Sequence, residues 1–179
     1  MEYYTVDIAG RKEDLPILTI GEHLRIAFFN LHGAQELTEY CGKKLAERIR
    51  ETGAEVVITA ESKGLQLAHV VARELGQDYY AVARKTKKLY MQDGISATIR
   101  SITTAGEQTL YLSKHDADIL RGKKIAIVDD VISTGGSLLG LERLSTQVGG
   151  TVVCKAFVLA EGDAKDRKDV TYLGEIPLL

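Results

Sequence analysis

Two adjacent carboxylates, Asp129 and Asp130, stand just before a loop of hydroxyls and glycines. The loop residues are Ser133, Thr134, Gly135, Gly136 and Ser137. Small residues let backbone N–H groups approach a phosphate, and a helix that starts there adds the partial positive charge of its N-terminus. Carboxylates beside a bound phosphate are explained if they hold sugar hydroxyls, with or without a metal ion. The pattern therefore predicts a site for a ribose 5-phosphate.

The elements around this loop are expected to place it at one edge of a parallel sheet. The apolar run 125–128 is typical of a strand covered on both faces, and ligands of open α/β sheets lie beyond the carboxyl ends of the strands. Apolar periodicity predicts helices, and short apolar runs predict strands. The expected helices are 33–53, 65–76 and 137–148, and the expected strands are 56–58, 79–84, 124–129, 151–160 and 170–173. This alternation predicts an α/β fold with a doubly wound, mostly parallel sheet flanked by helices.

Two smaller parts are expected to complete a single domain of residues 1–179. Residues 3–18 alternate loosely around Gly10, which predicts a hairpin within a small N-terminal hood of residues 1–34. Residues 94–113 lack helical periodicity, and the stretches SATIRSIT and QTLYLS predict two strands. We expect these strands to form a flexible β flap over residues 90–110.

The composition argues against several classes of function. Charges of both signs are interspersed and the net charge is −2, so no general nucleic-acid or membrane surface is expected. The residues after Met1 do not resemble a signal peptide, and no apolar run approaches the ~20 residues of a membrane span. A cytoplasmic location is therefore expected. Cys41 and Cys154 lie in a helical and a strand pattern, which suits reduced thiols.

The stretch VDDVISTGGS, residues 128–137, resembles the phosphoribosyl pyrophosphate (PRPP) motif of the type I phosphoribosyltransferase family. The resemblance implies the fold of that family. It also implies that Asp129 and Asp130 bind the ribose and contact a metal only indirectly, while residues 133–137 bind the 5-phosphate. Mg²⁺ as cofactor and a homodimer are implied in the same way.

A loop after the strand at 56–58 is a candidate for binding the pyrophosphate of PRPP. It contains Glu61, Ser62, Lys63 and Gly64. A loop that ends in glycine before a helix can present backbone N–H groups to a phosphate, and the family has its pyrophosphate loop at this position. Taken alone, Glu61 and Ser62 suit a helix cap equally well.

A basic run, Arg84-Lys85-Thr86-Lys87-Lys88, follows the strand expected at 79–84. Such runs are usually solvated faces, but at this edge they would stabilise charge that develops on a leaving pyrophosphate. Purine phosphoribosyltransferases have an Arg-Lys pair at the matching strand end. The resemblance therefore implies catalytic roles for Arg84 and Lys85 beside Asp129 and Asp130, and Lys88 is a further candidate for binding PRPP.

The acceptor base is expected to bind near the hood. Phe28, Phe29 and Leu31 offer the flat apolar contact that a purine needs, although both Phe residues suit a core equally well. The resemblance covers adenine and xanthine enzymes, with a slight preference for adenine from overall size and spacing. Many adenine enzymes have an acidic residue two before the flap glycine, where this chain has Thr104, with Glu107 just after the glycine. This difference leaves the choice of base open.

We therefore predict a purine-salvage enzyme that joins a purine base to the ribose of PRPP and releases pyrophosphate. Xanthine or another 6-oxopurine is the alternative acceptor. A regulator that binds PRPP without turnover, as purine-operon repressors do, is an alternative of another class, but the first 25 residues are too short and strand-like for a DNA-binding helix-turn-helix. A phosphoacceptor domain would also use paired acids, but the glycine-hydroxyl loop argues against it.

Overall fold

The computed structural model describes residues 1–20, 24–100 and 106–179. Its centre is a parallel sheet of five strands in the order β10-β9-β8-β4-β5. The strands are β4 (Val56–Ala60), β5 (Tyr80–Ala83), β8 (Lys124–Ile132), β9 (Thr151–Glu161) and β10 (Thr171–Ile176). Their short apolar runs are buried on both faces, as parallel strands require.

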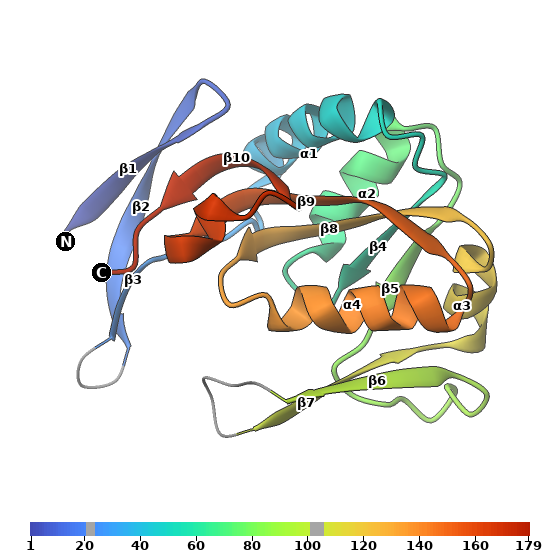
Figure 1. Ribbon diagram of the computed structural model, residues 1–179. Helices are drawn as coiled ribbons and strands as arrows, with labels where there is room; N and C mark the ends of the chain where they lie inside the picture. The colour runs from blue at the N-terminus through green and yellow to red at the C-terminus, as the bar shows by residue number, and fades with distance from the viewer. Residues whose placement is uncertain (21–23, 101–105) are drawn as a thin grey trace.

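Helices cover both faces of this sheet (Figure 1). Helices α1 (Gln35–Arg50) and α2 (Leu65–Glu74) pack on one face, where Leu45 and Leu67 share a core with Val128. Helices α3 (Lys114–Leu120) and α4 (Gly136–Gln147) pack on the other, where Leu141 shares a second core with Ile127. The alternation of β8 side chains between the two cores is the period-2 pattern of a strand. The predicted doubly wound α/β fold is confirmed.

A separate antiparallel sheet of three strands lies beside β10 (Figure 1). It consists of β1 (Tyr3–Ile8), β2 (Arg11–Ile20) and β3 (Leu24–Ala27). The predicted hairpin turns at Ala9 and Gly10, and the N–H of Ala9 donates to the carbonyl of Leu173 in β10 over 3.0 Å. Strand β3 was not predicted, because its residues carry a weak alternation over only four positions.

The two strands predicted around Gly106 form a hairpin of β6 (Ile95–Arg100) and β7 (Glu107–Leu112). The hairpin packs on α4 through Ile99 and Leu110, both of which approach Gly140. Mobility of this flap stays a prediction, and Thr104 lies outside the described residues.

Two short helices were not predicted. Helix α3 begins after Ser113, whose hydroxyl accepts from the N–H of Asp116 over 3.1 Å, a local N-cap signal. The 3₁₀ helix η1 (Gly162–Asp166) follows β9. Among the described residues, no helix is long and apolar enough to span a membrane. Both cysteines are free.

Candidate functional site

Three neighbouring strands, β8, β4 and β5, bring the predicted site residues to one edge of the sheet. Because the strands are parallel, the segments after β4 and β5 leave at the edge where Asp129 and Asp130 lie. The sequence analysis expected β8 to end at Asp129, but its pairing with β9 continues to Ile132. Pairing with β4 stops earlier, at Ile127, so the acids lie where β8 has separated from β4. This separation opens the site.

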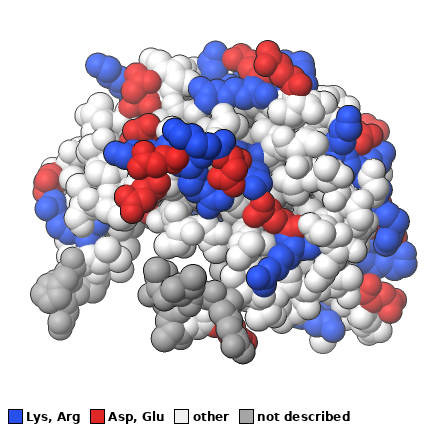
Figure 2. All heavy atoms as spheres, viewed as in Figure 1, with Lys and Arg blue, Asp and Glu red and all other residues white. Residues whose placement is uncertain are grey.

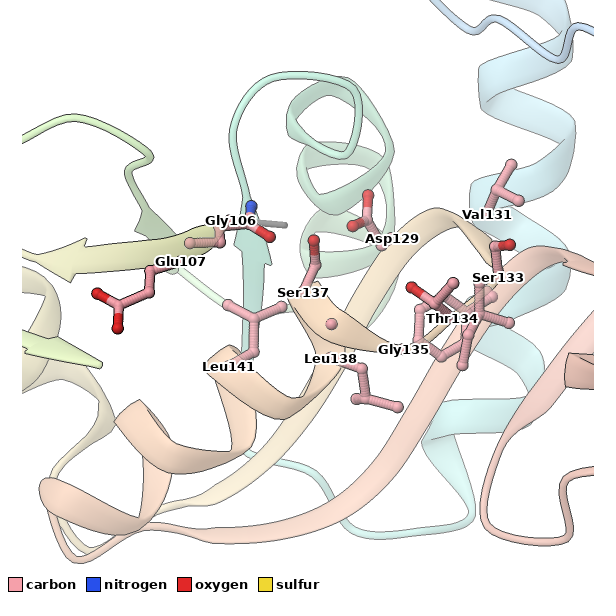
Figure 3. A pocket seen from close by; sticks show the side chains of 14 residues that line it. Gly106, Glu107, Asp129, Val131, Ser133, Thr134, Gly135, Ser137, Leu138 and Leu141 are labelled. Carbon is pink, nitrogen blue, oxygen red and sulfur yellow. The ribbon is translucent and has the colours of Figure 1, made fainter. Parts of the chain in front are cut away.

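Asp129 and Asp130 have different surroundings. The carboxylate of Asp129 points into a cavity of about 370 Å³ (Figure 3). It also accepts from the N–H of Asp130 over 2.9 Å. Asp130 is only 5 % exposed. Its Oδ1 accepts from the N–H of Val131 over 2.8 Å. Its Oδ2 is buried and has no hydrogen-bond partner among the described residues. A buried carboxylate oxygen without a donor is costly, so a ligand or water is expected to satisfy it.

Burial and, after it, the neighbouring carboxylate of Asp130 together raise the pKa of Asp129 to about 8, although part of its surface reaches the cavity. The positive charge of Lys85 acts in the opposite direction. Lys85 therefore acts electrostatically on Asp129 although the two residues lie at different strand ends. A ligand that brings donors or positive charge would favour the ionised carboxylate.

The loop 133–137 closes the other side of the cavity and leads directly into α4 (Figure 3). Gly135 has φ +83°, a left-handed conformation that side chains other than glycine rarely adopt. Among the residues that the structure describes, no side chain caps the N-terminus of α4. The N–H groups of its first turn lack helical partners and are available to an anion, as are the hydroxyls of Ser133, Thr134 and Ser137. The cavity thus combines an anion site with a carboxylate.

Gly64 fits tightly between the β4 loop and Asp129. A Cβ atom there would lie 2.1 Å from Oγ1 of Thr59 and 2.8 Å from Oδ1 of Asp129, so a larger residue would displace one of them. Oγ1 of Thr59 is itself buried with no partner among the described residues. Thr59 was expected at the start of the candidate pyrophosphate loop, without a role of its own, whereas it lies inside β4. The peptide bond between Glu61 and Ser62 is cis.

Glu61 joins the ends of β4 and β5. Nη1 of Arg84 donates to its Oε2 over 2.9 Å, and the N–H of Lys85 donates to its Oε1 over 2.9 Å. Burial alone would raise the pKa of Glu61, but these hydrogen bonds hold it below its ordinary value. Glu61 was predicted to bind PRPP. Both of its oxygens are used within the protein, which favours a role in holding Arg84 and Lys85 in place.

The remaining basic candidates are more open. The side chains of Lys85 and Lys88 are exposed, as is Ser62. Nζ of Lys63 lies 5.3 Å from the centre of the Phe28 ring, a cation–π contact that joins the β4 loop to the chain after β3. The predicted pyrophosphate loop and the predicted base-binding residue Phe28 are thus neighbours in space.

The three predicted base-binding residues differ in exposure. Phe29 and Leu31 are 3 % and 1 % exposed and belong to the core beneath α1 and α2, which favours packing roles for both. Phe28 is partly exposed. Of the three, Phe28 alone offers a ring face to a ligand.

Several residues that the sequence analysis did not assign to the site line the cavity. Gly106, Glu107 and Gln108 reach it from the start of β7 (Figure 3 labels the first two). Phe157 reaches it from β9. No local signal could have identified Phe157, which reads as an ordinary residue of a buried strand. Within the described part of the chain, no group of three or more His, Cys, Asp or Glu side chains is placed to hold a metal ion.

Comparisons with known proteins agree with this geometry. The chain resembles a xanthine phosphoribosyltransferase of Bacillus cereus, with 33 % identity over 170 residues that cover 89 % of this chain and 84 % of the relative. An adenine phosphoribosyltransferase of Brachyspira hyodysenteriae is 28 % identical over 132 residues, 74 % of each chain.

The fold is similar to that of solved structures. The crystal structure of an adenine phosphoribosyltransferase from Thermoanaerobacter pseudethanolicus has a TM-score of 0.76 at 19 % identity, covering 90 % of this chain and 95 % of that one. The family model of the phosphoribosyl transferase domain matches residues 30–174. This match includes every strand of the central sheet except the last residues of β10. The chain therefore belongs to the phosphoribosyltransferase family.

Proposed function

We propose that the protein transfers the 5-phosphoribosyl group of PRPP to a purine base and releases pyrophosphate. The observation that carries the proposal is the shared cavity of Asp129 and the N-terminus of α4, which places a carboxylate for ribose hydroxyls beside an anion site for the 5-phosphate. A ribose phosphate needs both the carboxylate and the anion site. Either of them alone would bind many other ligands.

The pyrophosphate is assigned to the neighbouring strand ends. Gly64 lies against Asp129, so a ribose held by Asp129 and Asp130 would direct its C1 substituent toward the β4 loop. Ser62, Lys63 and Gly64 would bind pyrophosphate there, and Arg84, Lys85 and Lys88 would supply positive charge. Glu61 keeps two of these basic residues at the edge of the site.

The reaction asks little covalent chemistry of the chain. A ring nitrogen of the base forms a bond to C1 as the bond from C1 to the pyrophosphate oxygen breaks, and the nitrogen then loses its proton. The residues align the nitrogen, C1 and leaving group, and such positioning can lower a barrier by up to ~7–11 kcal/mol. The flap of β6 and β7 would exclude water, which would otherwise hydrolyse PRPP.

The donor set fits Mg²⁺ carried with PRPP. Asp129 faces the cavity, Asp130 has a carboxylate oxygen without a partner, and hard cations prefer oxygen ligands. Because Mg²⁺ gives up its waters reluctantly, the two acids would hold it through water or ribose oxygens. When bound, the ion would neutralise charge on the phosphates.

Adenine is the proposed acceptor, with a 6-oxopurine such as xanthine as the second candidate. The fold neighbour is an adenine enzyme, whereas the relative with higher identity is a xanthine enzyme. Phe28 is proposed to contact the base. A homodimer in the cytoplasm, implied by the family resemblance, belongs to the same proposal and can be checked by light scattering and cell fractionation.

The test is pyrophosphate release from PRPP and Mg²⁺ with adenine, xanthine, hypoxanthine or guanine. Release with one base, lost in Asp129→Asn and kept in a control, Asp118→Asn, whose residue does not line the cavity, is the expected result. Asp118 pairs with Lys114 on the surface of α3, so its loss leaves the site intact. PRPP binding without release for any base would instead indicate a regulator.

A further inference from the structure

Arg167, in the segment after η1, lies against the loop that is proposed to hold the 5-phosphate. A Cβ atom built on Gly135 would be 2.7 Å from Nη1 of Arg167, so the guanidinium contacts the backbone of the loop at its left-handed turn. Gly135 is one of the residues that line the cavity, whereas Arg167 is not. The guanidinium therefore packs on the loop without itself lining the cavity.

Asp169 fixes the orientation of this guanidinium. Nε of Arg167 donates to Oδ1 of Asp169 over 2.9 Å, and Nη2 donates to Oδ2 over 2.8 Å. Such a bidentate pair holds the planar group in one geometry. Nη1 has no hydrogen-bond partner in the part of the chain that the structure describes, and it is the atom that approaches Gly135.

Asp169 is in turn connected to the helix that follows the loop. Nζ of Lys155 in β9 donates to Oδ2 of Asp169 over 2.9 Å and forms an ion pair with Glu142 in α4. Hydrogen bonds from Arg167 and Lys155 hold the pKa of Asp169 well below its usual range, so its charge persists at neutral pH. Figure 2 shows basic and acidic side chains gathered over β9, η1 and β10, where this segment lies. We call these four residues, Glu142, Lys155, Arg167 and Asp169, the Arg167 network.

We propose that Arg167 is a positioning residue that holds the 5-phosphate loop in its anion-binding conformation. The role rests on the proposed function of that loop. Glycine-rich backbone has much conformational freedom to lose, and a guanidinium packed on Gly135 removes part of it before the ligand arrives. The loop 133–137 contains no Lys or Arg, so Arg167 also places a positive charge next to the loop proposed to bind a phosphate dianion.

The test measures ligand binding by calorimetry for Arg167→Ala and Arg167→Lys, with ribose 5-phosphate, PRPP and pyrophosphate as ligands. Arg73→Ala is the matched control, because Arg73 makes a similar bidentate pair with Glu39 over 3.1 and 2.6 Å between α1 and α2. Arg167→Ala should weaken ribose 5-phosphate and PRPP roughly tenfold and leave pyrophosphate within about twofold. Arg167→Lys should recover only part of the loss, because an amine keeps the positive charge but cannot form the bidentate pair.

A steady-state measurement separates positioning from general damage. The KM for PRPP should rise in Arg167→Ala by the same factor as the dissociation constant, while kcat changes little, and Arg73→Ala should match the wild type. Unchanged ribose 5-phosphate binding in Arg167→Ala, equal loss of ribose 5-phosphate and pyrophosphate, or full recovery in Arg167→Lys would each overturn the role. If the wild type itself binds neither PRPP nor ribose 5-phosphate, the proposed function fails instead.

Discussion

Arg84 at the end of β5 donates to Glu61 at the end of β4, with 2.9 Å between Nη1 and Oε2. The pair lies at the same edge of the sheet as Asp129, since Gly64, which packs against Asp129, follows Glu61 in the β4 loop. Glu61 also accepts from the N–H of Lys85, so one carboxylate fixes the position of two basic residues. Glu61, which the sequence motif assigns to PRPP, therefore makes its hydrogen bonds within the protein.

Substituting Glu61 by Gln should release Arg84 and lower kcat/KM for PRPP by roughly tenfold to a hundredfold. The neutral amide cannot hold the guanidinium as a carboxylate does, and misplaced positive charge stabilises the leaving group poorly. Steady-state kinetics give this factor. Glu13→Gln is the control, because Glu13 forms a partly buried pair with Arg11 in β2, away from the site. Equal kinetics for the two variants would contradict a role for the Glu61 pair.

The stability of the unliganded protein should fall as the pH rises from about 4 to about 8. The pKa of Asp129 rises from 3.8 to about 8 on folding, so the native state binds the proton more tightly than the unfolded state does. The contribution of Asp129 to the free energy of unfolding is fully present below the ordinary Asp pKa. It is lost as the pH rises from about 4 to about 8. Denaturant unfolding of Asp129→Asn should show a weaker pH dependence and a gain of roughly 1–3 kcal/mol at pH 8.

Although Asp129→Asn should raise stability at pH 8, it should abolish catalysis. The effects of this residue on stability and on activity can therefore be measured separately. Saturating PRPP with Mg²⁺ should reduce the pH dependence in the wild type, because a bound cation and ribose donors favour the ionised carboxylate. A wild-type stability curve that stays flat or rises between pH 5 and 8, with no change in Asp129→Asn, would show that Asp129 is ionised in the free protein.

Replacing Gly64 by Ala should reduce activity at least about a hundredfold, because a 1 Å displacement near the reacting atoms can have that effect. The new Cβ would lie 2.1 Å from Oγ1 of Thr59 and 2.8 Å from Oδ1 of Asp129, so the carboxylate must move. Removing the nearer atom with Thr59→Ala should restore part of the activity in the double variant. A double-mutant cycle measures this coupling, and strictly additive effects would mean that Gly64 acts elsewhere.

Phe28 and Phe29 should behave in opposite ways when each is replaced by Ala. Phe29 is 3 % exposed in the core, and its removal should lower the free energy of unfolding by about 3–5 kcal/mol. Phe28 is partly exposed and has Lys63 over its ring. Its removal should raise the KM for the base roughly tenfold, as expected for a lost stacking contact, with a smaller effect on stability.

Chemical denaturation and base-saturation kinetics on the same two preparations decide this prediction. An unchanged KM for the base in Phe28→Ala would remove the residue from the base site. The residues for base selection would then have to be sought among those that line the cavity, for example Glu107 and Gln108 of β7.

The sequence by itself determined the parts of this protein that depend on neighbours along the chain. The apolar run of β8, its two acids and the glycine-hydroxyl loop predict a strand, a ligand site and a helix N-terminus in succession, and the repeated alternation of strands and helices predicts a parallel sheet. Even so, the local pattern missed β3 and α3, which are short and weakly periodic.

Only the tertiary structure decided which distant residues share the site. The strand order puts β4 between β8 and β5, which brings Glu61 to Arg84 and Gly64 to Asp129. Folding of the hood region turns Phe29 into the core and leaves Phe28 partly exposed, although the two are adjacent and identical in type. Arg167 reaches Gly135 from a segment with no recognisable motif. Such contacts follow from long-range packing and burial, which no local pattern of residues specifies.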